Sequence, residues 1–441
     1  MRRVVFSVTE LEPFFAKGGS VYSVDTETVD LHDLTLEGMS FCDGQDTYFV
    51  DLLNNPNRAG LIEYIQNWFK KIKVLISHNI VFEMKVFKAH DIPYEHCELF
   101  CTKVADHLLN ADRHHGLKDI MAADYGYTTV DWKEAVAAGK KSKTYYDYAL
   151  NDAEWAWELA NHQKFKLVEE GFQDLFKKIE MPFQHVLVEI ELNGVKVDLK
   201  QLEMTKAEIA TKIVALEKEM LDYLNEDYEL QCDLLGNAKI ISKINFNSSQ
   251  QLSDVLFIRL KLEPVDFTES GKPSVGVDTI LKLRGHPFIN ILEKYKIAQK
   301  LLSGFYEPIP EYIKEDGRIY PQYNDTGTVT GRLSCSKPNL QQLPKVNKVL
   351  PFDTRKCFIV EPGYSMITCD YSGQELRVLA EISRDENLMQ IFHDNKDLHL
   401  VTANEFYNLG IDERYLYANH PDAEMFKKKY KKERDLSLIH I

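Results

Sequence analysis

The sequence predicts an α/β protein with several domains. Its 441 residues exceed what one ordinary hydrophobic core organises, so two or three domains are expected. Residues 1–165 alternate short β-prone runs with helical patterns, which is typical of an α/β domain. Further along, residues 202–225 form the clearest amphipathic helix of the chain. A helical arm attached to an α/β body accounts for all three observations.

Short runs rich in β-branched and aromatic residues predict four strands near the N-terminus, each bounded by turn-forming residues. Helical patterns of apolar residues follow these strands. The strands are expected at residues 21–26, 36–42, 47–52 and 73–77, and the helices at residues 61–70, 81–90 and 145–162. Strands that alternate with helices favour a sheet with helices on its faces.

The composition changes near Met181-Pro182, where a second region begins. Asn193-Gly194 predicts the turn of a strand pair that runs through Ile190, Val195 and Val197. Helices are predicted at residues 202–225, 252–260 and 289–302, the second capped by Asn247-Ser248-Ser249, with a loop at residues 268–274. The apolar stripe of the first of these helices indicates that it packs on a partner.

The balance of charge limits the classes of function. A net charge of −15 argues against a protein coated with phosphate-binding side chains, but a nucleic-acid enzyme also uses carboxylates to hold metal ions. The basic runs at residues 140–143 and 427–432 are each interpreted as solvated surface. Seven scattered cysteines complete no zinc site. Because no apolar run could span a bilayer and no signal-peptide core follows Met1, we expect a cytoplasmic protein without a membrane partner.

Two carboxylates stand at the end of the first predicted strand. Asp25 and Glu27 are two residues apart, and side chains at i and i+2 share one face of a strand, so both can point at one metal ion. The spacing alone is weak evidence, because Asp152-x-Glu154 and Asp422-x-Glu424 repeat it. The position after an apolar strand favours a metal site over a solvated pair.

Two further pairs accompany predicted helices. Tyr148 and Asp152 are four residues apart, which places phenol and carboxylate one turn apart on one helix face. Asn79 and Glu83 begin the helix that follows the strand at residues 73–77. Each also has an ordinary structural explanation: Tyr148 can pack on the sheet, Asp152 can be solvated, and Glu83 can be a first-turn acid that the helix dipole favours.

Together and in this order, these residues resemble the three motifs of the DEDD-type 3′–5′ exonucleases, in the DEDDy subclass with tyrosine in the third motif. Residues 114–119, His-His-Gly-Leu-Lys-Asp, resemble that family's connecting segment, and the resemblance spans residues 15–165. It implies an RNase H-like fold and phosphodiester hydrolysis with two Mg²⁺ ions, for which Mn²⁺ can substitute. The implied roles are metal binding by Asp25, Glu27 and Asp152, water orientation by Tyr148, and DNA binding by Asn79.

The chain departs from the exonuclease family at one position. Glu83 stands where the family usually carries aspartate. The extra methylene moves the carboxylate by about one bond, and Mg²⁺ tolerates misplaced ligands poorly. Glu83 would therefore serve as a metal ligand through a shifted helix or through a water molecule.

The C-terminal half contains a longer signature. Thr330-Gly331-Arg332-Leu333-Ser334 is followed by the string Pro-Asn-Leu-Gln-Gln-Leu-Pro at residues 338–344. Either part alone is an ordinary glycine turn or proline-bounded loop, but the full string resembles the signature of family A DNA polymerases. The resemblance implies that Arg332 reaches the minor groove near the primer terminus, and that Asn339 and Gln342 contact the primer–template duplex or hold the loop.

A third signature is built around one aspartate. An apolar run at residues 364–368 leads into Asp370, and a helical pattern begins directly after it, which predicts a carboxylate at a strand end, directed at a divalent metal. Residues 370–377 resemble motif A of the same family, in a spelling more phage-like than bacterial, which implies that Asp370 holds Mg²⁺ for nucleotidyl transfer. Glu375 has two interpretations, a capping box with Ser372 or a steric gate against a ribose 2′-hydroxyl, and the match of the whole motif favours the gate.

The end of the chain carries two expected nucleotide contacts besides Glu375. His399 stands where the polymerase family has a histidine near the triphosphate, and Arg434 where an arginine of the fingers helix contacts phosphate. The lysine expected one turn later is replaced by Leu438, and residues 436–441 match nothing in the family. We therefore expect a chain truncated at its C-terminus, before the second catalytic aspartate of the palm, and competent only as an exonuclease.

These resemblances predict a phage-like family A DNA polymerase of the DNA polymerase I type, which acts in DNA replication and carries a proofreading exonuclease. The expected domains are an RNase H-like exonuclease at residues 1–165 and an incomplete right-hand polymerase, with a palm at 166–200 and 305–385, a thumb at 201–304 and the start of the fingers at 386–441. Expected partners are primer–template DNA, single-stranded 3′ ends, dNTPs in the full-length enzyme, and a replisome or processivity factor, inside a bacterial or phage-infected cell. Two alternatives stay open: a stand-alone exonuclease whose C-terminal half only grips DNA, and a non-catalytic DNA-binding replisome protein.

Overall fold

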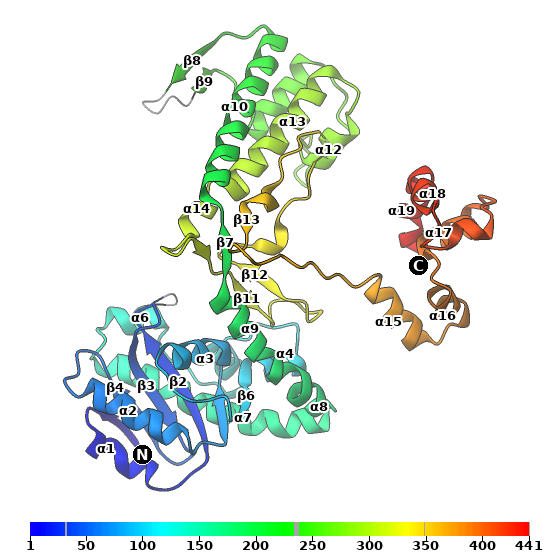
Figure 1. Ribbon diagram of the computed structural model, residues 1–441. Helices are drawn as coiled ribbons and strands as arrows, with labels where there is room; N and C mark the ends of the chain where they lie inside the picture. Colours follow the sequence, from blue (N-terminus) through cyan, green and yellow to red (C-terminus); the bar gives the residue numbers. More distant parts are fainter. Residues whose placement is uncertain (31–32, 233–237, 348, 441) are drawn as a thin grey trace. The chain divides into compact units, whose positions relative to one another are not determined.

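The computed structural model describes residues 1–30, 33–232, 238–347 and 349–440 (Figure 1). The chain divides into two compact units, Met1–Tyr364 and Ser365–Ile441, and each is described by itself. The division falls inside the range 305–385 that the sequence assigned to one palm segment. None of the described helices is both long and apolar enough to cross a membrane.

A six-stranded sheet forms the body of the N-terminal region. Its strands are β1 (Arg2–Val5), β2 (Val21–Thr28), β3 (Leu36–Cys42), β4 (Thr47–Asp51), β5 (Val74–Ser77) and β6 (Glu98–Cys101), in the order β1-β4-β3-β2-β5-β6. The interior strand β2 is antiparallel to β3 and parallel to β5. The four strands predicted from the sequence are thus confirmed as β2, β3, β4 and β5.

Helices lie against this sheet (Figure 1). They are α1 (Val8–Phe15), α2 (Arg58–Phe69), α3 (Ile80–Ala89), α4 (Thr102–Leu109), α5 (Leu117–Tyr125), α6 (Trp132–Ala137) and α7 (Lys143–Glu169). The long helix α7 is anchored where Ser23 Oγ of β2 donates to Ala153 O at 2.6 Å and Ser40 Oγ of β3 donates to Ala149 O at 2.7 Å. Because both bonds are buried, they set the register of α7 against β2 and β3.

The predicted strand pair around Asn193-Gly194 is wrong in its first half. Ile190 lies in the helix α9 (Met181–Asn193), which follows α8 (Gln173–Leu175) and the π-helix η1 (Phe176–Glu180). A buried ion pair of 2.6 Å joins Lys85 of α3 to Glu191 of α9. The packing of this segment against α3 outweighs the local turn signal, so only Val195–Val197 becomes a strand, β7.

A second region of the first unit is mainly helical. β7 lies between β10 (Arg318–Ile319) and β13 (Phe358–Ile359) in a small antiparallel sheet, and α10 (Leu199–Leu224) packs along α13 (Pro287–Leu301) (Figure 1). The helices predicted at residues 202–225 and 289–302 are confirmed. The helix predicted at 252–260 begins at the expected cap Ser248 but runs as α11 (Ser249–Ser253) into the π-helix η2 (Asp254–Arg259).

Shorter elements complete the first unit. They are β8 (Tyr228–Cys232), β9 (Ala238–Ser242), α12 (Val277–Lys282), the π-helix η3 (Leu302–Tyr306), α14 (Ile309–Tyr312), β11 (Gln322–Asn324), β12 (Ser334–Ser336), and the 3₁₀ helices η4 (Leu340–Gln342) and η5 (Thr354–Cys357). β11 and β12 pair as an antiparallel hairpin, whose connecting loop carries the first part of the polymerase-like signature, while residues 338–344 follow β12. This hairpin matters for the functional site, because side chains of the N-terminal region hold its loop.

The second unit consists of helices. They are α15 (Gln374–Ser383), α16 (Glu386–His393), α17 (Leu398–Tyr407), the 3₁₀ helix η6 (Glu413–Leu416), α18 (Ala423–Lys429) and α19 (Lys431–His440). The strand predicted at residues 364–368 is wrong: this segment has no regular structure, and Ile367 is 83% exposed. A strand needs a neighbour for its backbone N–H and C=O groups, and no described strand pairs with this segment.

Candidate functional site

A cavity of about 600 Å³ opens beside β2 and holds the N-terminal acidic residues. Besides the exposed Asp30, four carboxylates and one phenol line it, and we call it the carboxylate cavity: Asp25, Glu27, Glu83, Asp152 and Tyr148. Asn79 also lines this cavity. The structure therefore brings together all six residues that the sequence named in the N-terminal region, from three separate stretches of chain.

Each wall of the carboxylate cavity comes from a different element. Asp25 and Glu27 alternate with Thr26 on β2, whose side chains point to opposite faces in turn. Glu83 lies in the first turn of α3, and Asn79 is the N-cap residue of that helix without a capping side-chain bond. Tyr148 and Asp152 lie one turn apart on α7, whose register the two serine anchors set.

Burial and mutual repulsion shape the protonation of the carboxylates. Burial, then the charge of Asp152, raises the pKa of Glu27 to about 8. Burial also raises the pKa of Glu83 to about 8. The pKa of Asp25 is held well above its ordinary value by burial first, and then by Asp152, Glu27 and Glu83. Without a cation, the cavity therefore holds some of its carboxylates protonated near neutral pH.

The phenol of Tyr148 stays protonated for the same reasons. Burial first, and then the charges of Asp152 and Asp25, raise the pKa of Tyr148 above its usual range. Only 7% of Tyr148 is exposed. The side chain therefore offers an O–H group to the cavity at any ordinary pH.

One cation approaches the carboxylates from outside the predicted set. Lys118 Nζ lies 2.5 Å from Asp152 Oδ2 and 4.0 Å from the centre of the Tyr148 ring. Its charge lowers the pKa of Asp152 against the larger effect of burial, which raises it. From the sequence, Lys118 belonged to a connecting segment without a role; in the structure it is the second residue of α5.

The donor set fits a divalent cation with oxygen ligands. Among the described residues, no three His, Cys, Asp or Glu side chains stand ready around one point. Two buried carboxylate oxygens, Glu83 Oε2 and Asp152 Oδ1, nevertheless have no hydrogen-bond partner in the described structure. Carboxylate oxygens of this kind are the ligands that Mg²⁺ prefers. A divalent ion bound at Asp152 would compete with Lys118 for this carboxylate.

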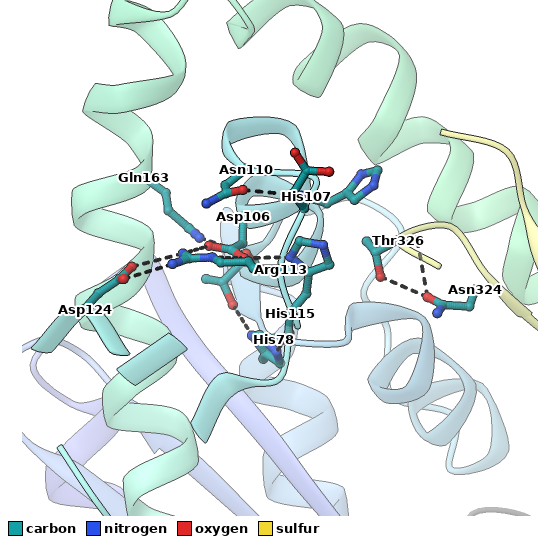
Figure 2. Close-up of polar contacts among 12 residues, drawn as sticks. His78, Asp106, His107, Asn110, Arg113, His115, Asp124, Gln163, Asn324 and Thr326 are labelled. Atoms are coloured by element: carbon teal, nitrogen blue, oxygen red, sulfur yellow. Dashed lines mark hydrogen bonds and ion pairs between the residues drawn. The ribbon is translucent and has the colours of Figure 1, made fainter. Parts of the chain in front are cut away.

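A polar network around Asp106 holds residues 113–115, which lead into α5 (Figure 2). Buried Asp106 accepts hydrogen bonds from Arg113 Nε at 3.0 Å and from His115 Nδ1 at 2.7 Å. Arg113 also pairs with Asp124 at 2.9 Å. Arg113 Nη2 also donates to Asp106 Oδ1, so three contacts on this buried carboxylate fix residues 113–115, and α5 with Lys118 follows them. No sequence pattern indicated this hub.

A histidine joins this network to the start of α3 (Figure 2). The His78 ring lies between Thr102 Oγ1 at 2.9 Å and the carbonyl oxygen of His115 at 2.8 Å. Burial lowers the pKa of His78 to about 3, so the ring is neutral. A neutral ring that donates from Nε2 to the carbonyl accepts the Thr102 hydroxyl proton at Nδ1. The ring therefore links the connecting segment to the turn that carries Asn79.

In the polymerase-like signature of the first unit, Arg332 and Gln342 are exposed and Asn339 is half-buried. Arg332 follows Gly331, whose φ of 74° makes the turn, and the Arg332 carbonyl accepts from Thr328 Oγ1 at 2.7 Å. Asn339 caps η4, because its Oδ1 accepts from Gln341 N at 3.1 Å. Gln342 lies at the end of η4 and is exposed. The structure thus uses the Asn339 side chain to hold the loop, one of its two expected roles.

The remaining polymerase-like residues lie in the second unit. Asp370 is exposed in a segment without regular structure, and Glu375 is in the first turn of α15. The capping box with Ser372 does not form, since the N-cap residue is Gly373. His399 lies in the first turn of α17, and Arg434 of α19 pairs with Asp397, the N-cap residue of α17, at 3.1 Å.

Sequence models of two known families match the chain. A model described as 3′–5′ exonuclease matches residues 3–167, and a model described as DNA polymerase family A matches residues 199–415. The first match contains the carboxylate cavity's acidic residues. The second contains Arg332, Asp370 and Glu375.

Curated relatives agree with both matches. A thermostable DNA polymerase I of Thermus filiformis is 36% identical over 248 residues, which cover 56% of this chain and 28% of that protein. DNA polymerase I of Borreliella burgdorferi is 28% identical over 415 residues, which cover 89% of this chain and 43% of that protein. The chain therefore spans less than half the length of these relatives.

A solved structure shares the fold. The POL domain of Pol1 from M. smegmatis, in complex with DNA primer–template and dNTP, matches with a TM-score of 0.75 at 22% identity. The match covers 99% of this chain and 75% of that one.

Proposed function

We propose, for a chain that belongs to DNA polymerase family A and carries a 3′–5′ exonuclease domain, that the carboxylate cavity releases nucleotides from the 3′ end of single-stranded DNA. The observation that carries this proposal is the meeting of four carboxylates and a protonated tyrosine in one cavity, inside the region that matches the exonuclease family. Such a cavity suits hydrolysis of a phosphodiester, whose negative charge needs cations and a proton donor nearby.

The residues divide the work by their chemistry. Asp25, Glu27 and Asp152 would hold Mg²⁺, with Glu83 as a fourth oxygen donor, and bound Mg²⁺ would supply charge stabilisation and an activated water. Mn²⁺ prefers similar oxygen ligands and would substitute. Tyr148 holds its proton and orients the attacking water or a phosphate oxygen through its O–H group.

Two residues at the rim suit the DNA strand itself. Asn79 presents an amide that no helix cap uses, next to Glu83. Trp132 lines the same cavity and is 42% exposed, so its ring can stack on a base. Stacking of this kind tolerates any base, as an enzyme that trims every 3′ end requires.

The polymerase region supports a second part of the proposal. Arg332, Asn339 and Gln342 would contact primer–template DNA, Asp370 would hold Mg²⁺, and Glu375, His399 and Arg434 would bind the incoming dNTP. The family match over residues 199–415 contains these residues except Arg434, and it supports their assignments together with the fold shared with a polymerase domain. The same proposal places the chain in the phage-like type of this family and its exonuclease in the DEDDy subclass. It also gives the chain a role in replication in the cytoplasm, with a processivity factor as partner.

Release of mononucleotides from a 3′-labelled single strand tests the exonuclease. We expect release that depends on Mg²⁺ and falls at least about a hundredfold in Asp25→Ala, because the geometry of the metal ligands is lost. Asp174→Ala is the matched control, since the Asp174 side chain is 76% exposed on α8, far from the lining residues in sequence. A folded wild-type chain that binds DNA but releases nothing would favour the scaffold alternative.

A further inference from the structure

The hairpin of β11 and β12 is held by two side chains of the exonuclease region and by one side chain of α9. Lys103 Nζ lies 3.1 Å from Asn324 Oδ1, Gln184 Nε2 lies 2.7 Å from Asp325 Oδ2, and His107 Nε2 lies 2.9 Å from the Thr328 carbonyl oxygen. Asn324 and Thr326 are seen beside His107 and His115 in Figure 2. These contacts fix where the hairpin ends, and therefore where the residue after β12 lies.

That residue is Lys337, and it reaches the carboxylate cavity. Lys337 follows β12 directly and lines the same cavity as Asp25, Glu83 and Tyr148. It lies outside the exonuclease match at residues 3–167 and inside the polymerase match at residues 199–415. One wall of the proposed exonuclease site thus comes from the polymerase region.

Lys337 differs from the other cation near the site. It is the one basic residue among the described residues that line the carboxylate cavity. Its side chain is exposed, and no ion pair of Lys337 is found among the described residues. Lys118, in contrast, is held by Asp152 and by the face of Tyr148. A ligand anion at the rim would therefore meet Lys337 without first breaking an ion pair.

The backbone holds Lys337 in an unusual conformation. Its φ is +54°, in the left-handed region that residues with a Cβ rarely adopt. Lys337 lies in the short connection between β12 and η4. The lysine is thus placed at the cavity by the backbone around it.

We infer that Lys337 binds a backbone phosphate of the DNA strand whose 3′ end occupies the carboxylate cavity. The inference rests on the proposed exonuclease function. It places a residue of the polymerase region in contact with DNA bound at the carboxylate cavity. A DNA strand is a polyanion, and four carboxylates repel it unless cations line the approach. Lys337 supplies such a charge one nucleotide or more from the reacting phosphate, where it would hold substrate without taking part in the chemistry.

Salt dependence of binding tests this contact directly. The full chain would carry Asp25→Asn, to block hydrolysis, and anisotropy would measure its affinity for a short fluorescent single strand. Lys337→Asn removes the charge and suits a left-handed backbone, because asparagine tolerates that region. We expect binding about two- to fivefold weaker. The slope of log K against log salt should shrink by about 0.7, the value for one phosphate contact on a single strand.

Two variants serve as controls. Lys345→Asn removes the same charge eight residues away, on a different cavity, and should leave affinity and slope unchanged. Lys337→Arg keeps the charge and should keep the slope. With Asp25 restored, Lys337→Asn should raise KM for the single strand and leave kcat unchanged, because a uniform binding contact is lost.

The outcomes separate the two proposals. An equal slope in Lys337→Asn and Lys345→Asn, with mononucleotide release intact, would overturn the Lys337 contact and leave the exonuclease standing. A slope that shrinks only in Lys337→Asn, in a chain that releases no mononucleotides, would keep the contact and overturn the exonuclease. If Lys337→Asn no longer melts cooperatively, Lys337→Gln replaces it, and the slope of log K against log salt is compared in the same way.

Discussion

The ammonium group of Lys118 lies 2.5 Å from Asp152 Oδ2 and 4.0 Å from the centre of the Tyr148 ring. It is therefore the internal counter-ion of the carboxylate cavity. The same carboxylate is one of the proposed metal ligands, so Lys118 and a divalent ion compete for it. This competition leads to the first prediction.

Lys118→Met should destabilise the metal-free protein and increase its response to Mg²⁺. Removing one partner leaves Asp152 buried without its cation, which should cost about 1–3 kcal/mol of unfolding free energy. Mg²⁺ no longer has to displace an ammonium group, so its stabilising effect should be larger than in the wild type. Thermal melting with EDTA and with Mg²⁺ measures both changes. Lys118→Arg keeps a cation and is the control, and identical melting of Lys118→Met and wild type would contradict the competition.

The metal-free protein should lose stability as the pH rises. Glu27 and Glu83 have pKa values of about 8 in the folded chain against an ordinary value of 4.5. Between these values the folded state binds protons that the unfolded chain has released, so stability is fully present below about pH 4.5 and is lost as the pH rises through about 8. Melting temperatures in EDTA should therefore fall as the pH rises from about 5 to about 8, and Mg²⁺ should reverse the trend. Glu27→Gln should flatten the dependence of the melting temperature on pH. An equally steep curve in that variant would contradict the assignment of this pH dependence to Glu27.

Glu83 should bind metal despite its extra methylene. Its Oε2 atom is buried without a hydrogen-bond partner among the described residues, which leaves it available to a cation. Glu83→Gln keeps the shape and removes the charge, so Mg²⁺ affinity measured by calorimetry should fall by about tenfold. Glu83→Asp restores the residue usual in the exonuclease family, but its shorter reach from α3 should leave the affinity between those of the wild type and Glu83→Gln. Unchanged affinity in Glu83→Gln would remove Glu83 from the ligand set.

Asp106→Asn should loosen the segment that carries Lys118. Asp106 is 2% exposed and accepts bonds from both Arg113 and His115, and the amide would leave Arg113 with a weaker partner. The expected loss of unfolding free energy is about 2–4 kcal/mol. Asp124→Asn is the matched control, because that carboxylate also pairs with Arg113 but is 35% exposed, and it should cost less than about 1 kcal/mol. Urea unfolding of the two variants measures the difference, and equal losses would refute the role of Asp106 as the hub.

Local sequence patterns predicted the structure correctly where the prediction depends on one helix or one strand alone. The stripe of residues 202–225 predicted a helix that exists as α10, and Ser248 caps the helix that it was expected to cap. The spacing of Asp25 and Glu27 on one strand, and of Tyr148 and Asp152 on one helix, likewise needed only the geometry of a single element. The meeting of these pairs in one cavity followed from the resemblance to the exonuclease family and was outside the reach of spacing alone.

Predictions failed where a distant part of the chain decides the outcome. Ile190 joined a helix because α9 packs on α3, where Lys85 and Glu191 pair at 2.6 Å. Residues 364–368 stayed without regular structure because a strand forms only beside another strand. Ser372 lost the capping role to Gly373, whose left-handed backbone begins α15.

By itself, the sequence determined four of the six strands of the N-terminal sheet, the acidic residues that belong together and the family of the chain. The tertiary structure alone decided which cations face those acids. Lys118 reaches Asp152 through a network around buried Asp106, and Lys337 reaches the cavity because three contacts hold the hairpin before it. A charge acts on whatever the fold brings near it, and nearness between residues far apart in sequence depends on packing that no local pattern records.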